Sequence, residues 1–270
     1  MLFYNKTTIF SKLTEVIYVS NSSLTQKSYY SFYFERNKYG ILNFVSPTMF
    51  QFIYLEEGQL IARCAKGDIT VNGGELLFVS PCTVWTPVFG NCEEIKGVLF
   101  HFRNWPDVDE LDFPPQTIKV DETLKNHIEA LPISERKINS GYIWRTYRFL
   151  DTVQHYLTKN DSASVKAIQK VLDFMRSNDN YTIPQLVELS GMKKSTFYTV
   201  FEEITGSTPI LTKHRFQAYK AEILLANTDL SIEEIARKTG FNSVAHFRKV
   251  FKSRYHKSPK HIRKPEEVIE

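Results

Sequence analysis

The spacing of hydrophobic residues changes near the middle of the chain. Up to about residue 105, apolar residues come in short runs that are rich in aromatic and β-branched side chains and are separated by turn residues. Such side chains suit a pleated, half-buried surface, so the runs predict strands. Six runs stand out: 29–34, 49–55, 60–63, 69–71, 76–79 and 97–102. Several short strands spaced by turns predict a β-barrel or a double-sheet sandwich.

Two turn signals in this region predict hairpins. Glu56-Glu57-Gly58 lies between the second and third runs, and Asn72-Gly73-Gly74 lies between the fourth and fifth. Asn and Gly tolerate the positive φ that tight two-residue turns require. We therefore expect each pair of runs to form neighbouring antiparallel strands.

Helical spacing replaces this pattern after a loop at 105–115 that contains three prolines. An amphipathic stretch at about 141–158 carries one apolar stripe, which must pack against another surface. The sequence leaves open whether that surface lies in the same molecule or in a second copy. The polar segment 160–164 is the best candidate for a linker. We therefore expect a first domain at 1–135, a helix and linker at 136–163 that could serve dimerisation, and a helical domain at 164–265.

The helical domain contains the same unit twice, at 183–201 and at 232–251. Each unit has a short segment with an apolar face, then a glycine, then a second segment with two phenylalanines. Gly191 matches Gly240, and the pair Phe197 and Phe201 matches Phe247 and Phe251. Two short helices joined by a tight turn that contains glycine form a helix-turn-helix. The second unit begins with Ser231-Ile-Glu-Glu, which is typical of a capping box.

Charge is distributed unevenly along the 270 residues, whose net charge is +4. Residues 1–160 have a net charge of −1 and residues 161–270 have a net charge of +5. The segment between Ile235 and Pro265 contains ten Lys or Arg and no acidic residue. A one-signed segment of this kind favours a polyanion as partner, because each neutralised phosphate releases counterions. The alternative is a solvated basic helical surface.

The cysteines and the N-terminal segment indicate a cytoplasmic protein. Cys64, Cys82 and Cys92 form an odd, sparse set without a C-x-x-C pair, which fits a reducing compartment better than a disulfide framework. No signal-peptide pattern and no apolar run of about 18 residues occurs, so we expect no membrane partner.

On Ser231 to Lys252, with Ser258-Pro259 and Arg263 beyond them, the chain resembles the AraC/XylS family of bacterial transcription regulators. The resemblance is strong over about 165–265, and the N-terminal strands match more loosely the cupin-like regulatory domain of many members. It implies an α+β multidomain fold, in which a cupin-like β-barrel or sandwich precedes an all-α domain with two helix-turn-helix units. It also implies that these units enter successive major grooves of double-stranded DNA, with RNA polymerase as a further partner.

In a helix-turn-helix, the N-terminal part of the second helix faces base edges while its apolar side packs inward. Arg248 is the strongest candidate for base reading, because a guanidinium can bond guanine O6 and N7 together. The alternative for each basic residue is a solvated position without a DNA contact. The residues expected to point outward, toward DNA, are Lys193, Lys194, Ser195, Tyr198 and Thr199 in the first unit and Asn242, Ser243, Ala245, His246, Arg248 and Lys249 in the second. The resemblance to the AraC/XylS family implies that those which read bases are Ser195, Tyr198, Thr199, Ala245, His246, Arg248 and Lys249. Those expected to lie on phosphates are Lys252, Arg254, Lys257 and Lys260.

The first unit departs from this basic pattern. Glu202-Glu203 stand where the second unit has Lys252-Ser253. Carboxylates at that position repel phosphates, so we expect the second unit to contribute more of the affinity for DNA.

The N-terminal domain is expected to sense an effector. Its lumen could be lined by aromatic residues and hold a small, partly apolar molecule, although filling the core is the more common role for each of these residues. The candidates are Phe34, Phe52, Tyr54, Phe78, Trp85 and Phe102. A protein partner is the other option. Cys82 and Cys92 as a redox pair is a weaker hypothesis.

Three functions compete on these observations. The sequence favours a sequence-specific DNA-binding transcription regulator, most often an activator in this family. A cupin-type metal enzyme with a DNA-binding appendage is the second, but the strands offer little beyond His101 as a ligand, and we expect no metal, cofactor or catalytic residue. A nonspecific architectural DNA binder is the third. Two reading units favour a defined site, and a homodimer stays open.

Overall fold

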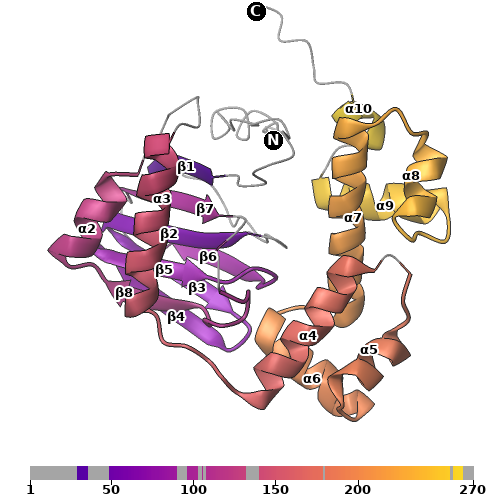
Figure 1. The fold of residues 1–270 in the computed structure, drawn as a ribbon, viewed down its shortest axis with the longest axis horizontal. Helices are drawn as coiled ribbons and strands as arrows, with labels where there is room; N and C mark the ends of the chain where they lie inside the picture. The colour runs from indigo at the N-terminus through magenta and orange to yellow at the C-terminus, as the bar shows by residue number, and fades with distance from the viewer. Residues whose placement is uncertain are drawn as a thin grey trace, which may run out of the picture. The chain divides into compact units, whose positions relative to one another are not determined.

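The computed structural model describes residues 29–35, 49–89, 96–102, 105, 108–131, 140–178, 180–255 and 258–263. Side chains are described for most of these, but not for 29–35, 89, 96, 101, 262 and 263. The chain forms two compact units that meet between Asp161 and Ser162. Figure 1 shows a β-rich first unit and an all-helical second unit. Across the described residues, no helix is both long and apolar enough to span a membrane.

The first unit contains two antiparallel sheets. The five-stranded sheet has the order β1-β7-β2-β5-β8, and the three-stranded sheet has the order β4-β3-β6. This arrangement agrees with the expected barrel or double-sheet sandwich. The strands are β1 (Tyr29–Glu35), β2 (Phe50–Glu57), β3 (Gln59–Cys64), β4 (Gly67–Asn72), β5 (Glu75–Val79), β6 (Trp85–Phe89), β7 (Lys96–Phe102) and β8 (Gln116–Lys119).

Both predicted hairpins are wrong. Strands β2 and β3 belong to different sheets, and so do β4 and β5. The turns at Gly58 and Gly73-Gly74 are corners at which the chain passes from one sheet to the other, and they bond to each other through Gly73 N to Gly58 O at 3.0 Å. A Cβ on Gly73 would lie 3.1 Å from the carbonyl oxygen of Glu56, so glycine lets the two backbones approach closely at this corner.

Strand β2 is apolar on both faces and therefore contributes to two cores. Ile53 and Leu55 pack between the two sheets, together with Trp85 and residues of β3 and β4. Phe52 and Tyr54 point to the opposite face of the five-stranded sheet. Successive side chains on a strand alternate between faces, which explains the division.

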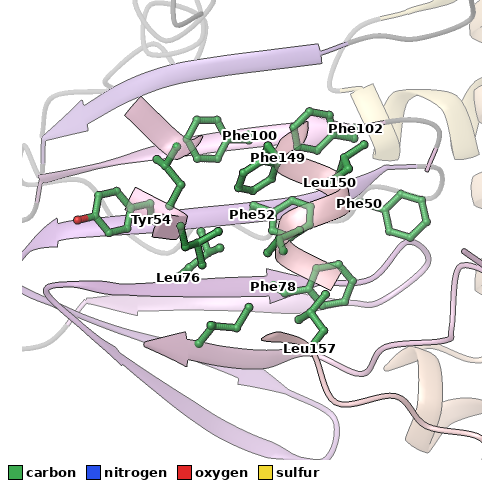
Figure 2. Packing of buried hydrophobic residues seen from close by; sticks show 14 of the residues in the cluster. Phe50, Phe52, Tyr54, Leu76, Phe78, Phe100, Phe102, Phe149, Leu150 and Leu157 are labelled. Atoms are coloured by element: carbon green, nitrogen blue, oxygen red, sulfur yellow. The ribbon is translucent and has the colours of Figure 1, made fainter. Parts of the chain in front are cut away.

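Helices α2 (Glu122–Glu129) and α3 (Ser140–Val153) cover that second face of the five-stranded sheet (Figure 1). Figure 2 shows Phe149 and Leu150 of α3 inserted among the phenylalanines of the strands. The Phe149 ring is fully buried, and its centroid lies 5.2 Å from that of Phe52 and 5.7 Å from that of Phe102. Helix α3 thus packs within the first unit. The sequence instead predicts a separate segment at 136–163 that contains this helix and the linker.

The segment after α3 is held to the first unit instead of forming a free linker. A 3-10 turn, η1 (Gln154–Tyr156), follows α3 directly. The main-chain N–H of Thr158 donates to Gln116 Oε1 at 2.8 Å, and that of Asn160 donates to the carbonyl of Asp112 at 2.7 Å. Ser162 then caps the next helix by accepting from the N–H of Val165. Within the predicted linker at 160–164, Asn160 thus bonds to the first unit and Ser162 caps the helix that follows it.

The regular elements described in the second unit are all helices. Figure 1 shows the long helix α7 flanked by α4 to α6 at one end and by α8 and α9 at the other. The helices are α4 (Ala163–Ser177), α5 (Ile183–Ser190), α6 (Lys194–Thr205), α7 (Pro209–Asn227), α8 (Ile232–Lys238), α9 (Val244–Tyr255) and α10 (Pro259–Arg263).

Candidate nucleic-acid interface

Helices α5 and α8 begin in the same way in the two repeated units. At α8, the N–H of Ser231 donates to Glu234 Oε2 at 2.8 Å, and the N–H of Glu234 donates to Ser231 Oγ at 3.1 Å. At α5, the N–H of Thr182 donates to Gln185 Oε1 at 2.8 Å. These bonds satisfy backbone donors that a helix start leaves unpaired. The main-chain N–H and the hydroxyl of Ser231 both donate to the Glu234 carboxylate, which lowers the pKa of Glu234 because these bonds favour its charged form.

A left-handed glycine follows the first helix of each unit. Gly191 has φ of 68° and Gly240 has φ of 75°. A side chain at Gly191 would meet no atom within 4 Å, so glycine is required there by the backbone conformation and not by lack of space. The turn reverses the chain, and α6 or α9 then packs against its partner helix.

Two phenylalanines on each second helix form the inward face. Phe197 and Phe201 of α6 are fully buried, as are Phe247 and Phe251 of α9. The fifty-residue correspondence of these positions confirms that the two units are built alike. The burial of these four rings also fixes which residues of α6 and α9 face outward.

The outward face of α9 is a basic stripe, which we define as Ala245, Arg248, Lys249 and Lys252. These residues follow an i, i+3, i+4, i+7 spacing, which places them on one side of a helix. All four are exposed. Arg248 Nη2 lies 3.8 Å from Glu233 Oε1 of α8, and both side chains are more than half exposed. The guanidinium is thus accessible to a ligand that outcompetes an exposed carboxylate.

The matching face of α6 carries Ser195, Tyr198, Thr199 and Glu202. Ser195, Thr199 and Glu202 are exposed, and Tyr198 is half-buried with its ring 5.8 Å from that of Phe197. The Thr199 hydroxyl donates to the Ser195 carbonyl at 3.2 Å. Lys193 and Lys194, at the start of α6, are exposed. The equivalent of the basic stripe is therefore nearly neutral on α6 and ends in a carboxylate.

The other predicted contact residues differ in their surroundings. Asn242 and Ser243 are exposed before α9, and Ser243 Oγ accepts from the N–H of His246 at 3.2 Å. Arg254, expected on phosphates, is half-buried with its guanidinium 6.0 Å from the centre of the Tyr255 ring. It lies two turns after Phe247 and so departs from the basic stripe. Lys257 lies outside the described residues.

Sequence reasoning missed two residues of α7 that contact the second helix-turn-helix. The His214 ring packs edge-on against the ring of His246, with 4.9 Å between centroids. Gln217 is 5% exposed and donates from Nε2 to the carbonyl of Gly240 at 2.8 Å. A glutamine among the apolar positions of α7 was the available signal for the second of these contacts.

Burial, His246 and Lys213 together hold the pKa of His214 below its ordinary value of 6.5. As the pH falls through 6.5, His214 takes up a proton in the unfolded chain while it stays neutral in the folded chain. The free energy of unfolding should therefore fall as the pH drops from 7.5 to 5.5. Urea unfolding followed by circular dichroism should show a shallower pH dependence in His214→Gln than in the parent protein. His261→Gln, on the exposed part of α10, is the control and should keep the parent slope. A His214→Gln slope equal to that of the parent would refute the prediction.

Of the six aromatic residues expected around one lumen, the five whose side chains are described lie in two separate clusters. Phe52, Tyr54, Phe78 and Phe102 lie on the helix-covered face of the five-stranded sheet. Trp85 lies between the sheets, where its indole N–H donates to Gln51 Oε1 at 2.9 Å. The side chain of Phe34 lies outside the described residues.

The described residues include no group of three or more His, Cys, Asp or Glu side chains that could hold a metal ion. Cys82 is buried in a backbone with φ of 62°, and its Sγ lies 3.7 Å from Glu110 Oε2. Cys92, the other half of the redox hypothesis, lies outside the described residues.

Comparison with known proteins supports the assignment of the paired units. A family model described as a helix-turn-helix domain matches residues 186–265. An uncharacterized HTH-type transcriptional regulator of Haemophilus influenzae is 40% identical over 88 residues, which cover 32% of this chain and 29% of that protein. Residues 186–265 thus form a helix-turn-helix domain similar to those of transcription regulators.

Other transcription regulators match over a similar share of the chain. The HTH-type transcriptional activator RhaS of Salmonella arizonae is 31% identical over 84 residues, or 31% of this chain and 30% of RhaS. The chain thus spans about a third of the length of the curated relatives it matches.

A solved structure extends the likeness to the N-terminal unit. The crystal structure of unsaturated fatty acid bound ToxT from Vibrio cholerae matches 88% of this chain and 95% of ToxT, with a TM-score of 0.55 and 12% identity. At that identity the match shows the fold alone: a cupin-like β unit followed by a helical domain with helix-turn-helix units.

Proposed function

We propose that this protein is a sequence-specific transcription regulator that activates its targets and recruits RNA polymerase. Its two helix-turn-helix units lie in successive major grooves of one DNA site, with α6 and α9 as the reading helices. The N-terminal unit controls this activity through an effector. Two observations support activation over repression. RhaS is named as an activator, and activators are the most common members of the AraC/XylS family that the chain resembles.

The basic stripe of α9 is the observation that carries the proposal. Three cations stand on one exposed helical face whose opposite face is fixed by two buried phenylalanines. Arg248 is placed in the N-terminal part of α9, where base edges are reached, and Lys252 is one turn further along. At the position of α6 that matches Lys252, Glu202 repels phosphates. The second helix-turn-helix should therefore supply most of the phosphate contacts.

Selection of bound fragments from random and genomic DNA tests the proposal. The full chain should enrich a common motif with two parts about one helical turn apart. The enriched site should then resist competition by random DNA at moderate salt. A chain that binds DNA but enriches no motif would be the nonspecific architectural binder, and a chain that binds none would overturn the proposal.

Neutralising Glu233 should strengthen DNA binding. Its carboxylate competes with DNA for Arg248 and repels phosphates, so Glu233→Gln should raise affinity for the selected site by up to about fivefold, given the small energies of exposed ion pairs. Glu129→Gln, on an exposed surface of α2 in the first unit, is the control for loss of one negative charge. Titration of labelled DNA at fixed salt measures the effect, and unchanged or weaker binding by Glu233→Gln would contradict it.

For the effector, we favour a small, partly apolar molecule over a protein partner. The described aromatic side chains of the helix-covered face pack directly against one another, so a ligand entering there must displace rings of α3. ToxT, whose structure contains an unsaturated fatty acid, suggests a first probe. A thermal shift with unsaturated fatty acids tests this choice, because a ligand that binds only the folded state raises the melting temperature. No stabilisation across a metabolite screen would favour a protein partner.

A further inference from the structure

We infer that Gln217 and Lys213 of α7 are positioning residues that set the separation of the two reading helices and hence the operator spacing the protein accepts. This inference rests on the proposed function and deepens it. It starts from three polar side chains, Lys213, Gln217 and Lys220, which follow one stripe of α7 at i, i+4, i+7 spacing. Each of them donates to a main-chain carbonyl of another segment.

Gln217 ties α7 to the turn of the second helix-turn-helix. The acceptor of its side-chain amide is the carbonyl of Gly240, the left-handed residue between α8 and α9. The bond is 2.8 Å long and Gln217 is 5% exposed, so water competes little for it. A bond to this turn acts on the point from which α9 departs. Gln217 therefore constrains the direction of the reading helix and not merely the packing of α8.

Lys213 ties α7 to the first helix-turn-helix at the entrance to α5. Its Nζ donates to the carbonyl of Tyr181 at 2.6 Å and lies 4.5 Å from the centre of the Tyr181 ring. Tyr181 is buried and packs on Phe174 of α4. Lys220 adds a longer bond of 3.4 Å to the carbonyl of Asn178, the residue that caps α4. The two lysines thus hold the connection that leads into the first helix-turn-helix.

Directional bonds of this kind matter because apolar packing alone leaves helices free to slide or rotate. Hydrogen bonds to main-chain carbonyls have a narrow range of angles, so they fix register as well as proximity. On DNA, one added base pair moves the second half-site by about 3.4 Å and rotates it by about 36°, since half-sites repeat each helical turn of 10–10.5 base pairs. A molecule whose two helix-turn-helix units are tied to one stripe of α7 cannot follow that displacement without breaking a tie.

The test measures spacing discrimination by the full chain. The selected operator is compared with versions that carry one base pair more or one fewer between the two half-sites. The parent protein should lose roughly tenfold or more in affinity on either altered operator, a loss comparable to that of a mismatched base pair. Gln217→Met keeps the side-chain length and removes the bond, and it should reduce the loss to about threefold or less. Lys213→Met, at a less buried site, should do the same and serves if Gln217→Met folds poorly. Ile223→Ala, on the exposed side of α7, is the control and should keep the parent ratio.

A merely structural role would weaken binding to all three operators by the same factor and leave the ratio unchanged. That result, or a parent ratio retained in both variants, would overturn the inference while the proposed function stands. A parent protein that prefers no operator over random DNA would instead overturn the proposed function and the inference with it.

Discussion

Replacing Phe149 with alanine is expected to lower the free energy of unfolding of the first unit by about 3–5 kcal/mol. The ring is fully buried and contacts Phe52, Phe100 and Phe102, with centroid distances of 5.2, 5.9 and 5.7 Å. Its removal leaves a cavity between α3 and the five-stranded sheet, and the surrounding strands cannot collapse to fill it. Few substitutions in the described residues should cost the first unit more.

All three tryptophans of the chain, Trp85, Trp105 and Trp144, belong to the first unit. Tryptophan fluorescence in a urea titration therefore reports the unfolding of this unit, while the helical signal of the second unit is followed separately. Asp151→Ala changes an exposed residue on the same helix and should shift stability by no more than about 0.5 kcal/mol. A loss below about 1 kcal/mol for Phe149→Ala would mean that α3 does not close the core of the first unit.

Replacing Arg248 with alanine is expected to cost about 1–3 kcal/mol of binding to the selected operator. The residue stands in the basic stripe of α9, and a guanidinium there can bond a guanine through two parallel hydrogen bonds. Affinity for random DNA should change much less, because that binding depends mainly on phosphates. The ratio of specific to nonspecific affinity is therefore the quantity to measure.

Arg237→Ala provides the matched comparison, since it removes the same charge from an exposed position in the last turn of α8, outside the stripe. It should weaken specific and random DNA alike, with little effect on the ratio. If Arg248→Ala and Arg237→Ala behave identically, Arg248 contacts phosphate at most and the proposed base reading is wrong.

The second unit was predictable from the sequence because its local signals agree. The capping residues at Ser231 and Glu234, the glycines of the two turns and the four phenylalanines all serve in the structure as their spacing indicated. A duplication also checks itself, since each copy tests the pattern in the other. Contacts between segments were not predictable in this way. The bonds of Gln217 and Lys213 join residues 23 and 32 positions apart, and no periodicity reports such pairs.

In the first unit the sequence predicted the strands but not their partners. The signal at Asn72-Gly73-Gly74 correctly indicated a tight turn, yet the same backbone freedom serves a corner between sheets as well as a hairpin. The described aromatic residues expected around one lumen are divided between two clusters for a related reason. Strand β2 is apolar on both faces, so alternation could not tell the face between the sheets from the face under α2 and α3. Only the position of Phe149 in space distinguishes them.

Methylation protection of guanine N7 on the selected operator tests the central claim most directly, because N7 lies in the major groove. With the full chain bound, we expect two clusters of protected guanines about one helical turn apart on one face of the duplex. The cluster contacted by α9 should be lost in Arg248→Ala, with the other one retained. Protection confined to a single cluster, or no protection of major-groove positions at all, would contradict the account of two tandem reading helices.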